Sequence, residues 1–287
     1  MKLRKRILFI TAILFSSCQT LEKNEIKTEI KSFETTLNGK VKYFKHSEYN
    51  AKEKFGEIQK DGKEINSTNI KFNEKGVEEE ANLFDSESSR DIKFLLKYDE
   101  KGNNIETTIY NQTGDLLGKL LMEYDDDRNI IEEKGFVDFY DYGLTLTSRI
   151  ELKYDKYGNE VMRSSYADEK LTEKITYKYD DKNNKIEENV FNSDGSLKEK
   201  KELSYNEKNL CSLFKSYDSN KKLEQKVSFS YDDFDNEIER VSVGLGGKQL
   251  FKRTFTYEYD EKNNWVKKIV YNDEKPSFII EREIEYY

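Results

Sequence analysis

The sequence predicts an all-β protein in which tandem β-hairpin repeats form one long, twisted antiparallel meander sheet. Three observations lead to this prediction. A Tyr-Asp dipeptide recurs about every 26 residues, apolar and polar residues alternate before each dipeptide, and a turn signature follows it. Strands whose side chains alternate in this way bury one face and expose the other, which is typical of antiparallel sheets.

The Tyr-Asp marker occurs along most of the chain. Six copies and three variants are present, at Phe72-Asn73, Tyr98-Asp99, Tyr124-Asp125, Tyr154-Asp155, Tyr179-Asp180, Tyr205-Asn206, Tyr231-Asp232, Tyr259-Asp260 and Tyr286-Tyr287. The residues before each marker alternate with a period of two, as in Phe255, Tyr257 and Tyr259. This period, with its aromatic and β-branched residues, predicts a strand that ends at each marker.

The residues after each marker predict a tight turn closed by a bulge. An Asp side chain can cap the turn, and a Gly such as Gly102 or Gly158 supplies the left-handed conformation. Where Gly is missing, the position holds residues that tolerate positive φ, namely Asn183, Asn209, Asp235 and Asn263, with Arg128 as the exception.

A second strand follows each turn, so each unit is a β-hairpin. A lone hairpin is marginally stable in water, and neighbouring copies must cover its aromatic face. We therefore expect roughly sixteen or more strands in one domain over residues 37–287, curling so that the Tyr-rich face closes on itself. Within this domain, Lys60-Asp61-Gly62-Lys63 predicts one further hairpin turn.

The first residues predict export and lipid attachment. Residues 1–6 carry four basic side chains and no acid, and an apolar run follows from Ile7 to Phe15 that is too short to span a membrane. Leu14-Phe15-Ser16-Ser17-Cys18 resembles the lipobox of bacterial lipoproteins. We expect residues 1–17 to be a cleaved signal peptide, Cys18 to carry the lipid, and residues 18–36 to be a stalk or short helix.

The net charge argues against a nucleic-acid partner, and the cysteine count argues against a disulfide. The formal net charge is −8, and loss of residues 1–17 would make it about −12. Because such a surface repels phosphate backbones, we expect no nucleic-acid partner. Cys211 is the only cysteine besides Cys18, so no disulfide within the mature chain is expected.

The marker array resembles the YD repeats of the RHS family, and more closely the YD-repeat lipoproteins of Bacteroidetes bacteria. The resemblance covers Phe72 to Tyr287 and rests on the recurring marker with its turn and aromatic alternation. In RHS proteins these repeats form a shell around a toxin, but this chain is too short to enclose a domain. The resemblance implies a β-sheet scaffold at a bacterial surface.

The sequence shows no catalytic constellation, so we expect no enzymatic activity and no cofactor. His46 is the only histidine, which limits His-based triads and metal clusters, and we expect it to be a surface strand residue. The run from Asp125 to Asn129 has acids but lacks the Gly and Glu of a calcium loop, so no metal site is predicted. Because Asp and Glu are abundant, a pair of carboxylates at the spacing of a glycoside hydrolase is not excluded by the sequence.

Two departures from the repeat are candidate ligand-binding residues. The lengthened unit between Tyr124 and Tyr154 contains extra aromatic residues, among them Phe136, Phe139, Tyr140 and Tyr142. These side chains can form a contact surface or extend the buried face. Trp265 is the second candidate. Strand alternation places it opposite Val266, on the polar face, where it can stack on a sugar.

These features predict a lipid-anchored, non-enzymatic scaffold or binding protein of the cell envelope, with a glycan or an envelope protein as its ligand. The outer membrane is the expected location, and the periplasmic and external faces both stay open. Two alternatives are a carboxylate-based polysaccharide hydrolase and a role in toxin immunity or competition.

Overall fold

The computed structural model describes residues 27–30, 35–88, 90–138 and 143–287. The predicted signal peptide, Cys18 and three candidate aromatic residues, Phe139, Tyr140 and Tyr142, lie outside these ranges. Eighteen antiparallel strands, β3 to β20, form a closed barrel whose strand order follows the chain. Two further strands, β1 and β2, pair with each other in a separate small sheet.

The strand bounds follow the predicted repeat. They are β1 (Lys27–Ile30), β2 (Thr35–Asn38), β3 (Val41–Lys54), β4 (Glu57–Phe72), β5 (Glu78–Asp85), β6 (Arg90–Tyr98), β7 (Asn104–Asn111), β8 (Leu116–Tyr124), β9 (Ile130–Asp138), β10 (Leu144–Tyr154), β11 (Glu160–Ala167), β12 (Lys170–Tyr179), β13 (Lys185–Asn192), β14 (Leu197–Tyr205), β15 (Cys211–Tyr217), β16 (Leu223–Tyr231), β17 (Glu237–Gly244), β18 (Gln249–Tyr259), β19 (Trp265–Asn272) and β20 (Lys275–Tyr286). A short 3-10 helix, η2 (Leu245–Gly247), joins β17 to β18. In the part of the chain that the structure describes, no helix is long and apolar enough to cross a membrane.

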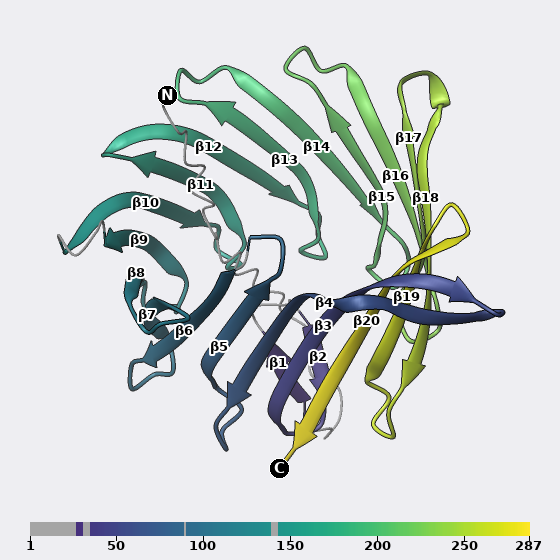
Figure 1. Ribbon diagram of the computed structural model, residues 1–287. Coiled ribbons are helices and arrows are strands. Elements are labelled where there is room, and N and C mark those ends of the chain that lie inside the picture. The colour runs from purple at the N-terminus through teal and green to yellow at the C-terminus, as the bar shows by residue number, and fades with distance from the viewer. Residues whose placement is uncertain (1–26, 31–34, 89, 139–142) are drawn as a thin grey trace, which may run out of the picture.

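The sheet is closed, which corrects the prediction of a long twisted meander. The all-β, antiparallel hairpin architecture is confirmed. However, β20 pairs with β3 from Phe278 opposite Asn50 to Tyr286 opposite Val41, so the first and last barrel strands are neighbours (Figure 1). An open sheet would leave two rows of unpaired backbone N–H and C=O groups, and closure satisfies both.

The turns after the markers have the predicted chemistry. In the turn after Tyr179, Asp180 Oδ1 accepts hydrogen bonds from the backbone N–H of Lys182 at 3.0 Å and of Asn184 at 2.8 Å. Positive φ occurs at Gly102, Gly158, Asn183, Asn209, Asp235 and Asn263, as predicted, and at Arg128 too. Arg128 is held by its side chain, which donates to Asn103 Oδ1 and the Lys101 carbonyl.

The marker tyrosines face the inside of the barrel and link neighbouring repeats. Most buried hydrophobic side chains share their face, including Met122, Leu152, Tyr177, Val190, Val227 and Phe255. Five marker hydroxyls reach back to a backbone carbonyl of the previous hairpin, those of Tyr124, Tyr154, Tyr179, Tyr205 and Tyr231. Tyr179 donates to the Glu160 carbonyl at 2.8 Å, and Tyr205 donates to the Lys185 carbonyl at 2.7 Å. The hydroxyls therefore tie successive hairpins together at the rim where the marker turns lie.

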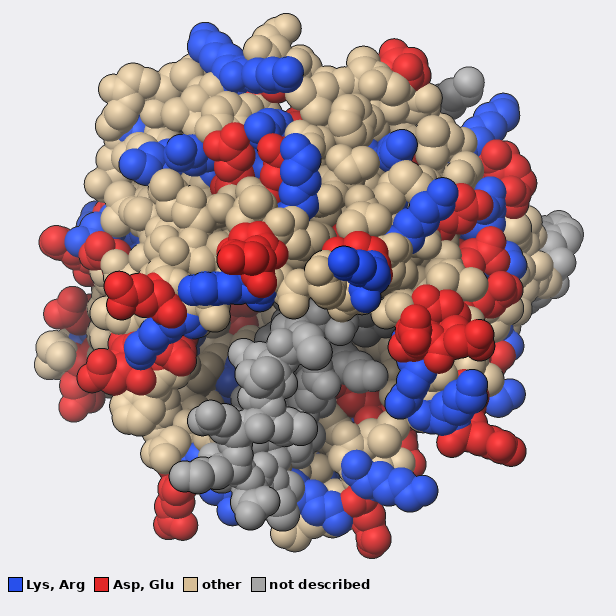
Figure 2. All heavy atoms as spheres, turned by 180° about the vertical axis from the view of Figure 1, so that it is seen from behind, with Lys and Arg blue, Asp and Glu red and all other residues tan. Residues whose placement is uncertain are grey.

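The outer wall is charged. Lys and Glu side chains pair across adjacent strands, as where Glu187 on β13 lies 2.7 Å from Lys178 on β12 and 3.0 Å from Lys200 on β14. Figure 2 shows basic and acidic side chains interspersed over one side of the molecule. This wall is therefore suited to contact with water.

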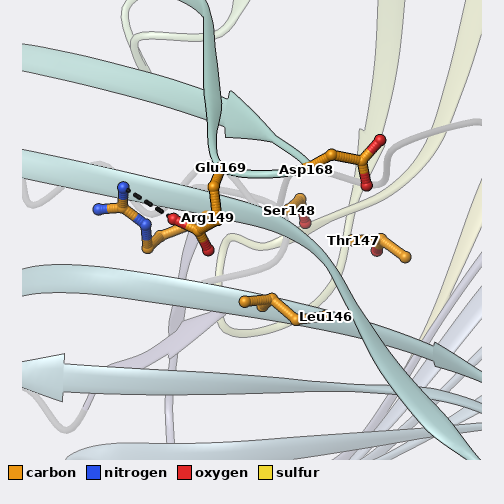
Figure 3. A pocket seen from close by; sticks show the side chains of 6 residues that line it. All are labelled: Leu146, Thr147, Ser148, Arg149, Asp168 and Glu169. Carbon is orange, nitrogen blue, oxygen red and sulfur yellow. Dashed lines mark ion pairs between the residues drawn. The ribbon is translucent and has the colours of Figure 1, made fainter.

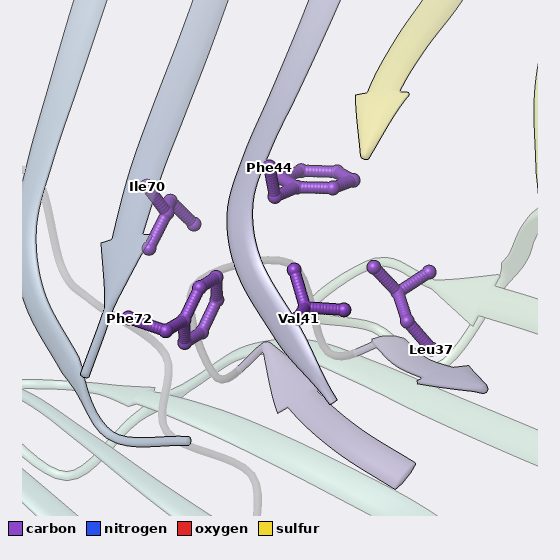
Figure 4. Packing of buried hydrophobic residues seen from close by; sticks show 5 residues of the cluster. All are labelled: Leu37, Val41, Phe44, Ile70 and Phe72. Atoms are coloured by element: carbon purple, nitrogen blue, oxygen red, sulfur yellow. The ribbon is translucent and has the colours of Figure 1, made fainter. Parts of the chain in front are cut away.

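Strand β2 packs against the barrel near its closure. Leu37 of β2 is buried with Val41, Phe44, Ile70 and Phe72 (Figure 4). Residues 27–30, within the segment predicted to be a stalk or short helix, form a strand. This cluster is the most completely buried apolar group of the described residues.

The hairpin turn predicted at residues 60–63 is wrong, because the chain reverses earlier. Strand β3 ends at Lys54 and β4 begins at Glu57. Phe55 and Gly56 both have positive φ, at 55° and 80°, as a two-residue hairpin loop requires. Lys60, near the tip, lies 2.6 Å from Glu281 on β20, so this long hairpin bends over the outer wall.

We predict that Asp180→Ala lowers the free energy of unfolding by about 1 kcal/mol, because two backbone N–H groups lose their acceptor. Partial burial pushes the pKa of Asp180 upward, but hydrogen bonds from Asn184 outweigh it and leave the pKa lowered. The carboxylate therefore stabilises the fold above the unfolded pKa and loses this effect as pH falls through the folded pKa.

Urea unfolding at pH 7 and pH 3 measures this effect. Asp181→Ala, an exposed change in the same turn, is the control. Equal losses in both variants would contradict the capping role of Asp180.

Candidate functional site on the inner wall

The turn between β18 and β19 places Trp265 on the inner wall. Trp265 pairs with Tyr259, whereas Glu258 pairs with Lys267, so Val266 is the extra residue of a β-bulge. A bulge opposes two residues to one and breaks the simple alternation of faces. Trp265 therefore shares the face of the marker tyrosine. The expectation that it lies on the polar face is wrong for this reason.

Aromatic and basic side chains surround Trp265. The guanidinium carbon of Arg282 lies 3.3 Å from the centroid of the indole, a close cation–π contact. His46 and Tyr257 meet the indole edge-on, with ring centroids at 6.0 Å and 5.9 Å. His46 and Arg282 are direct partners in the pairing of β3 with β20. The only histidine and the only tryptophan of the chain thus meet at the closure of the barrel.

Three cations line this part of the inner wall, and we call Arg240, Lys268 and Arg282 the basic cluster. They lie on β17, β19 and β20, and the field of Arg240 and Arg282 acts on Lys268. Arg240 forms a bidentate pair with Glu237, with both N–O distances at 2.7 Å. Across the described residues, no salt bridge involves Lys268 or Arg282, and Arg282 Nε is buried without a hydrogen-bond partner.

Burial and like charge shift the protonation of these groups. Burial, joined by the like charges of Arg240 and Arg282, lowers the pKa of Lys268 to about 8 against the opposing effect of Glu237. Burial also lowers the pKa of Arg282, whose guanidinium stays charged at neutral pH. Burial, Arg282 and Lys268 together lower the pKa of His46 to about 4, so its imidazole is neutral at pH 7.

Three other repeats have matched charges at positions where this one does not. The first inward residue after a marker turn pairs with the residue three positions later in Glu160–Arg163 and Glu237–Arg240 at 2.8 and 2.7 Å. In the last repeat Trp265 takes the first position, so Lys268 has no carboxylate three residues earlier. The cluster therefore holds three cations against one carboxylate, in a chain whose net charge is −8.

The second predicted aromatic surface does not join this site. Phe136 on β9 pairs with Leu146 on β10, and its neighbours Gly135 and Val137 face inward, so Phe136 faces outward. Strands β9 and β19 lie on opposite sides of the ring (Figure 1). Phe136 and Trp265 are therefore separate surfaces.

A small recess near β10 illustrates how cations are matched elsewhere. Its volume is about 60 Å³, and it is lined by Leu146, Thr147, Ser148, Arg149, Asp168 and Glu169 (Figure 3). Arg149 is paired with three carboxylates there, those of Glu132, Glu151 and Glu169. An anion would gain little from a guanidinium already neutralised in this way.

Two inward carboxylates, Glu133 and Glu160, act on each other. Burial raises the pKa of Glu133, Arg163 lowers it less, and Glu160 raises it again. Both oxygens of Glu160 accept hydrogen bonds from Arg163, at 2.8 and 3.0 Å, and both residues are buried. This arrangement mainly stabilises the wall.

The acids of the marker turns serve the turns themselves. Asp125, considered above for calcium, accepts from the backbone and side chain of Asn129 at 2.8 and 3.0 Å. Over the described ranges, no three His, Cys, Asp or Glu side chains are placed to hold a metal ion.

Sequence reasoning identified Trp265 but missed its companions. His46 is partly buried on the inner wall instead of being an exposed strand residue. Lys268 was detectable in principle, because it follows Trp265 by the spacing at which Arg163 follows Glu160. Arg282 and His46 were not detectable, because only barrel closure brings residue 46 beside residue 282.

No family model and no curated protein matches this chain. Among solved structures, it is similar to a porin-like protein from Bacteroides uniformis, with a TM-score of 0.45 and 8% identity, covering 85% of this chain and 96% of that chain. A TcdB2-TccC3-Cdc42 structure matches with a TM-score of 0.36 and 12% identity, covering 86% of this chain and 15% of that chain. These likenesses are too distant to assign a function.

We predict that Lys268→Met raises the free energy of unfolding by about 1 to 2 kcal/mol at pH 7, because it removes an unmatched, partly buried cation. The folded pKa of about 8 lies below the ordinary value of 10.5, so the cation destabilises the fold fully below pH 8. The gain should shrink as pH rises from 8 toward 10.5.

Urea unfolding at pH 7 and pH 9.5 checks both the sign and the pH trend. Lys200→Met is the control, since Lys200 is matched by Glu187 and Glu202 on the outer wall and its loss should not stabilise the protein. A destabilised Lys268→Met protein at pH 7 would refute the charge assignment.

Proposed function

We propose that this protein is a non-enzymatic binding protein of the cell envelope, held to a membrane through lipid on Cys18, and that it binds a glycan at the Trp265 site. The observation that carries the proposal is the indole of Trp265 on the inner wall, surrounded by Tyr257, His46 and Arg282. Aromatic rings beside fixed polar groups are the usual lining of small-ligand sites.

The position of the site favours a glycan over an envelope protein. A ligand of the inner wall of a closed barrel has to be small or extended, because a folded partner would need to enter the barrel. An envelope protein, the other expected ligand, is better suited to the outer wall, where Phe136 lies.

The outer wall supports a tether rather than a wall embedded in lipid. Ion pairs such as Lys178–Glu187 and Lys119–Glu106 cross between its strands. A wall that faces lipid presents an apolar band instead, because charges at the bilayer midplane are costly. Lipid on Cys18 would then hold the barrel at the membrane.

A polysaccharide hydrolase is the second candidate, and the raised pKa of Glu133 beside Glu160 favours it. In that case Glu133 is the general acid. Glu133→Gln should then abolish release of reducing sugar from envelope polysaccharide. Unchanged release by Glu133→Gln, or no release by the wild type, removes this candidate.

We predict that Trp265→Ala abolishes the signals that the wild-type protein gives on a glycan array, because the ligand loses its stacking surface. Phe136→Ala, on the outer wall, is the matched control and should keep them. Signals that survive Trp265→Ala and vanish with Phe136→Ala would move the site to the lengthened unit.

We also predict that Cys18→Ala abolishes labelling by radioactive fatty acid and releases the protein from the membrane fraction, because the variant lacks the thiol that the lipid modifies. Cys211→Ala is the control and should label normally. Labelling that persists in Cys18→Ala would refute the anchor.

A further inference from the structure

We propose that the basic cluster is an anion-binding subsite of the inner wall, and that the ligand of the Trp265 site carries a carboxylate or phosphate group. The inference rests on the proposed binding function and specifies its ligand class. An acidic saccharide meets both requirements, since its ring can stack on an aromatic side chain while its anionic group binds the cations.

The donors of the cluster are positioned for such a group. Arg282 Nε is buried and lacks a hydrogen-bond partner among the described residues, and its guanidinium is held in place by the indole of Trp265. Lys268 lies with its ammonium nitrogen 4.1 Å from the centroid of Phe255 and 5.4 Å from that of Tyr257. Aromatic contacts orient both cations without neutralising them, so their charges stay available.

Packing alone does not account for the cluster. Two neighbouring unmatched cations repel each other and lose hydration, which costs stability unless a counter-ion is supplied. The inner wall supplies a counter-ion elsewhere, as where Glu188 lies 3.2 Å from Lys185 and 2.8 Å from Lys201. At Lys268 the equivalent place is occupied by Trp265, an aromatic surface instead of a charge. A bound anion would supply the missing charge.

The wall is more basic around the cluster than the three cations alone suggest. Arg253 on β18 lies directly opposite Arg240 on β17, an arrangement of like charges that is unfavourable by itself. Arg253 donates to Asn272 Oδ1 at 2.9 Å rather than to a carboxylate. Glu237 is the carboxylate that acts on Lys268, and its two oxygens are occupied by Arg240.

Binding of an anion should depend on pH through Lys268, whose pKa is lowered to about 8, and through Arg282, whose pKa burial lowers to about 9. The anion favours the protonated ammonium, so affinity should fall as pH rises from 7 to 9.5. The charged and titratable groups that face Lys268 from the neighbouring strands are Glu237 and Arg240 on β17, Tyr257 on β18, Arg282 on β20 and His46 on β3. Of these, His46 is already neutral at pH 7 and Tyr257 has a raised pKa, so neither titrates in this range.

Binding can be followed by the fluorescence of the single tryptophan, because an anion that binds Arg282 changes the environment of the indole. Fluorescence of the full chain is titrated at pH 7 with pyrophosphate, with trigalacturonate and with neutral cellotriose. We expect a saturable response to at least one of the two anions, which also identifies the anionic group. Lys268→Met should weaken that response about 10- to 100-fold, and Lys268→Arg should largely retain it.

Lys200→Met on the outer wall is the matched control for general charge, and circular dichroism verifies the fold of each variant. A response to pyrophosphate or trigalacturonate that is unchanged in Lys268→Met overturns the assignment of the subsite. A response to cellotriose alone overturns the anion inference and leaves the proposed glycan binding in place. If neither anion produces a response while the glycan array gives signals that Trp265→Ala abolishes, the anion inference is likewise overturned and glycan binding is kept.

Discussion

The pairing of β20 with β3 is the contact on which the rest of the structure depends. Nine residues of β20 face residues of β3 across this seam, and their backbone groups remove both free edges of the sheet. The seam also gives the wall an inside and an outside, which an open sheet of marker repeats would lack. The only histidine of the chain meets Arg282 and Trp265 there, so the candidate site exists because the barrel closes.

A second device recurs around the barrel, the bulge after each marker turn. Register shifts follow Lys97, Glu123, Lys153, Lys178, Ser204, Ser230 and Glu258, always one residue before the marker tyrosine. Each bulge turns the first residue of the next strand inward beside the tyrosine. Because a bulge adds one residue to one strand only, it changes which side chains line the wall without changing which strands are neighbours. Repeats of nearly identical turn chemistry can therefore present different inward residues.

The inward residues that follow these bulges differ in how their charges are matched. Glu160 pairs with Arg163, and Lys185 pairs with Glu188, so these charges are matched within one strand. Trp265 and Lys268 occupy the same pair of positions in the last repeat and are not matched. A site that costs stability where its neighbours do not is typical of a binding surface, since a ligand can supply the missing charge.

The sequence by itself determined the hairpin repeat, its turns and the special place of Trp265. Periodicity of two and turn chemistry are local properties of the chain, so the positive φ at Asn183 and Asn263 followed from residue type alone. It predicted a curl that closes the Tyr-rich face, but it did not determine the pairing of β20 with β3, the inward direction of Trp265, or the contacts that place His46, Lys268 and Arg282 near it. Closure depends on accumulated twist over eighteen strands, and the bulge reverses what simple alternation indicates. Only the tertiary structure, by joining β20 to β3, decided which distant residues share a wall.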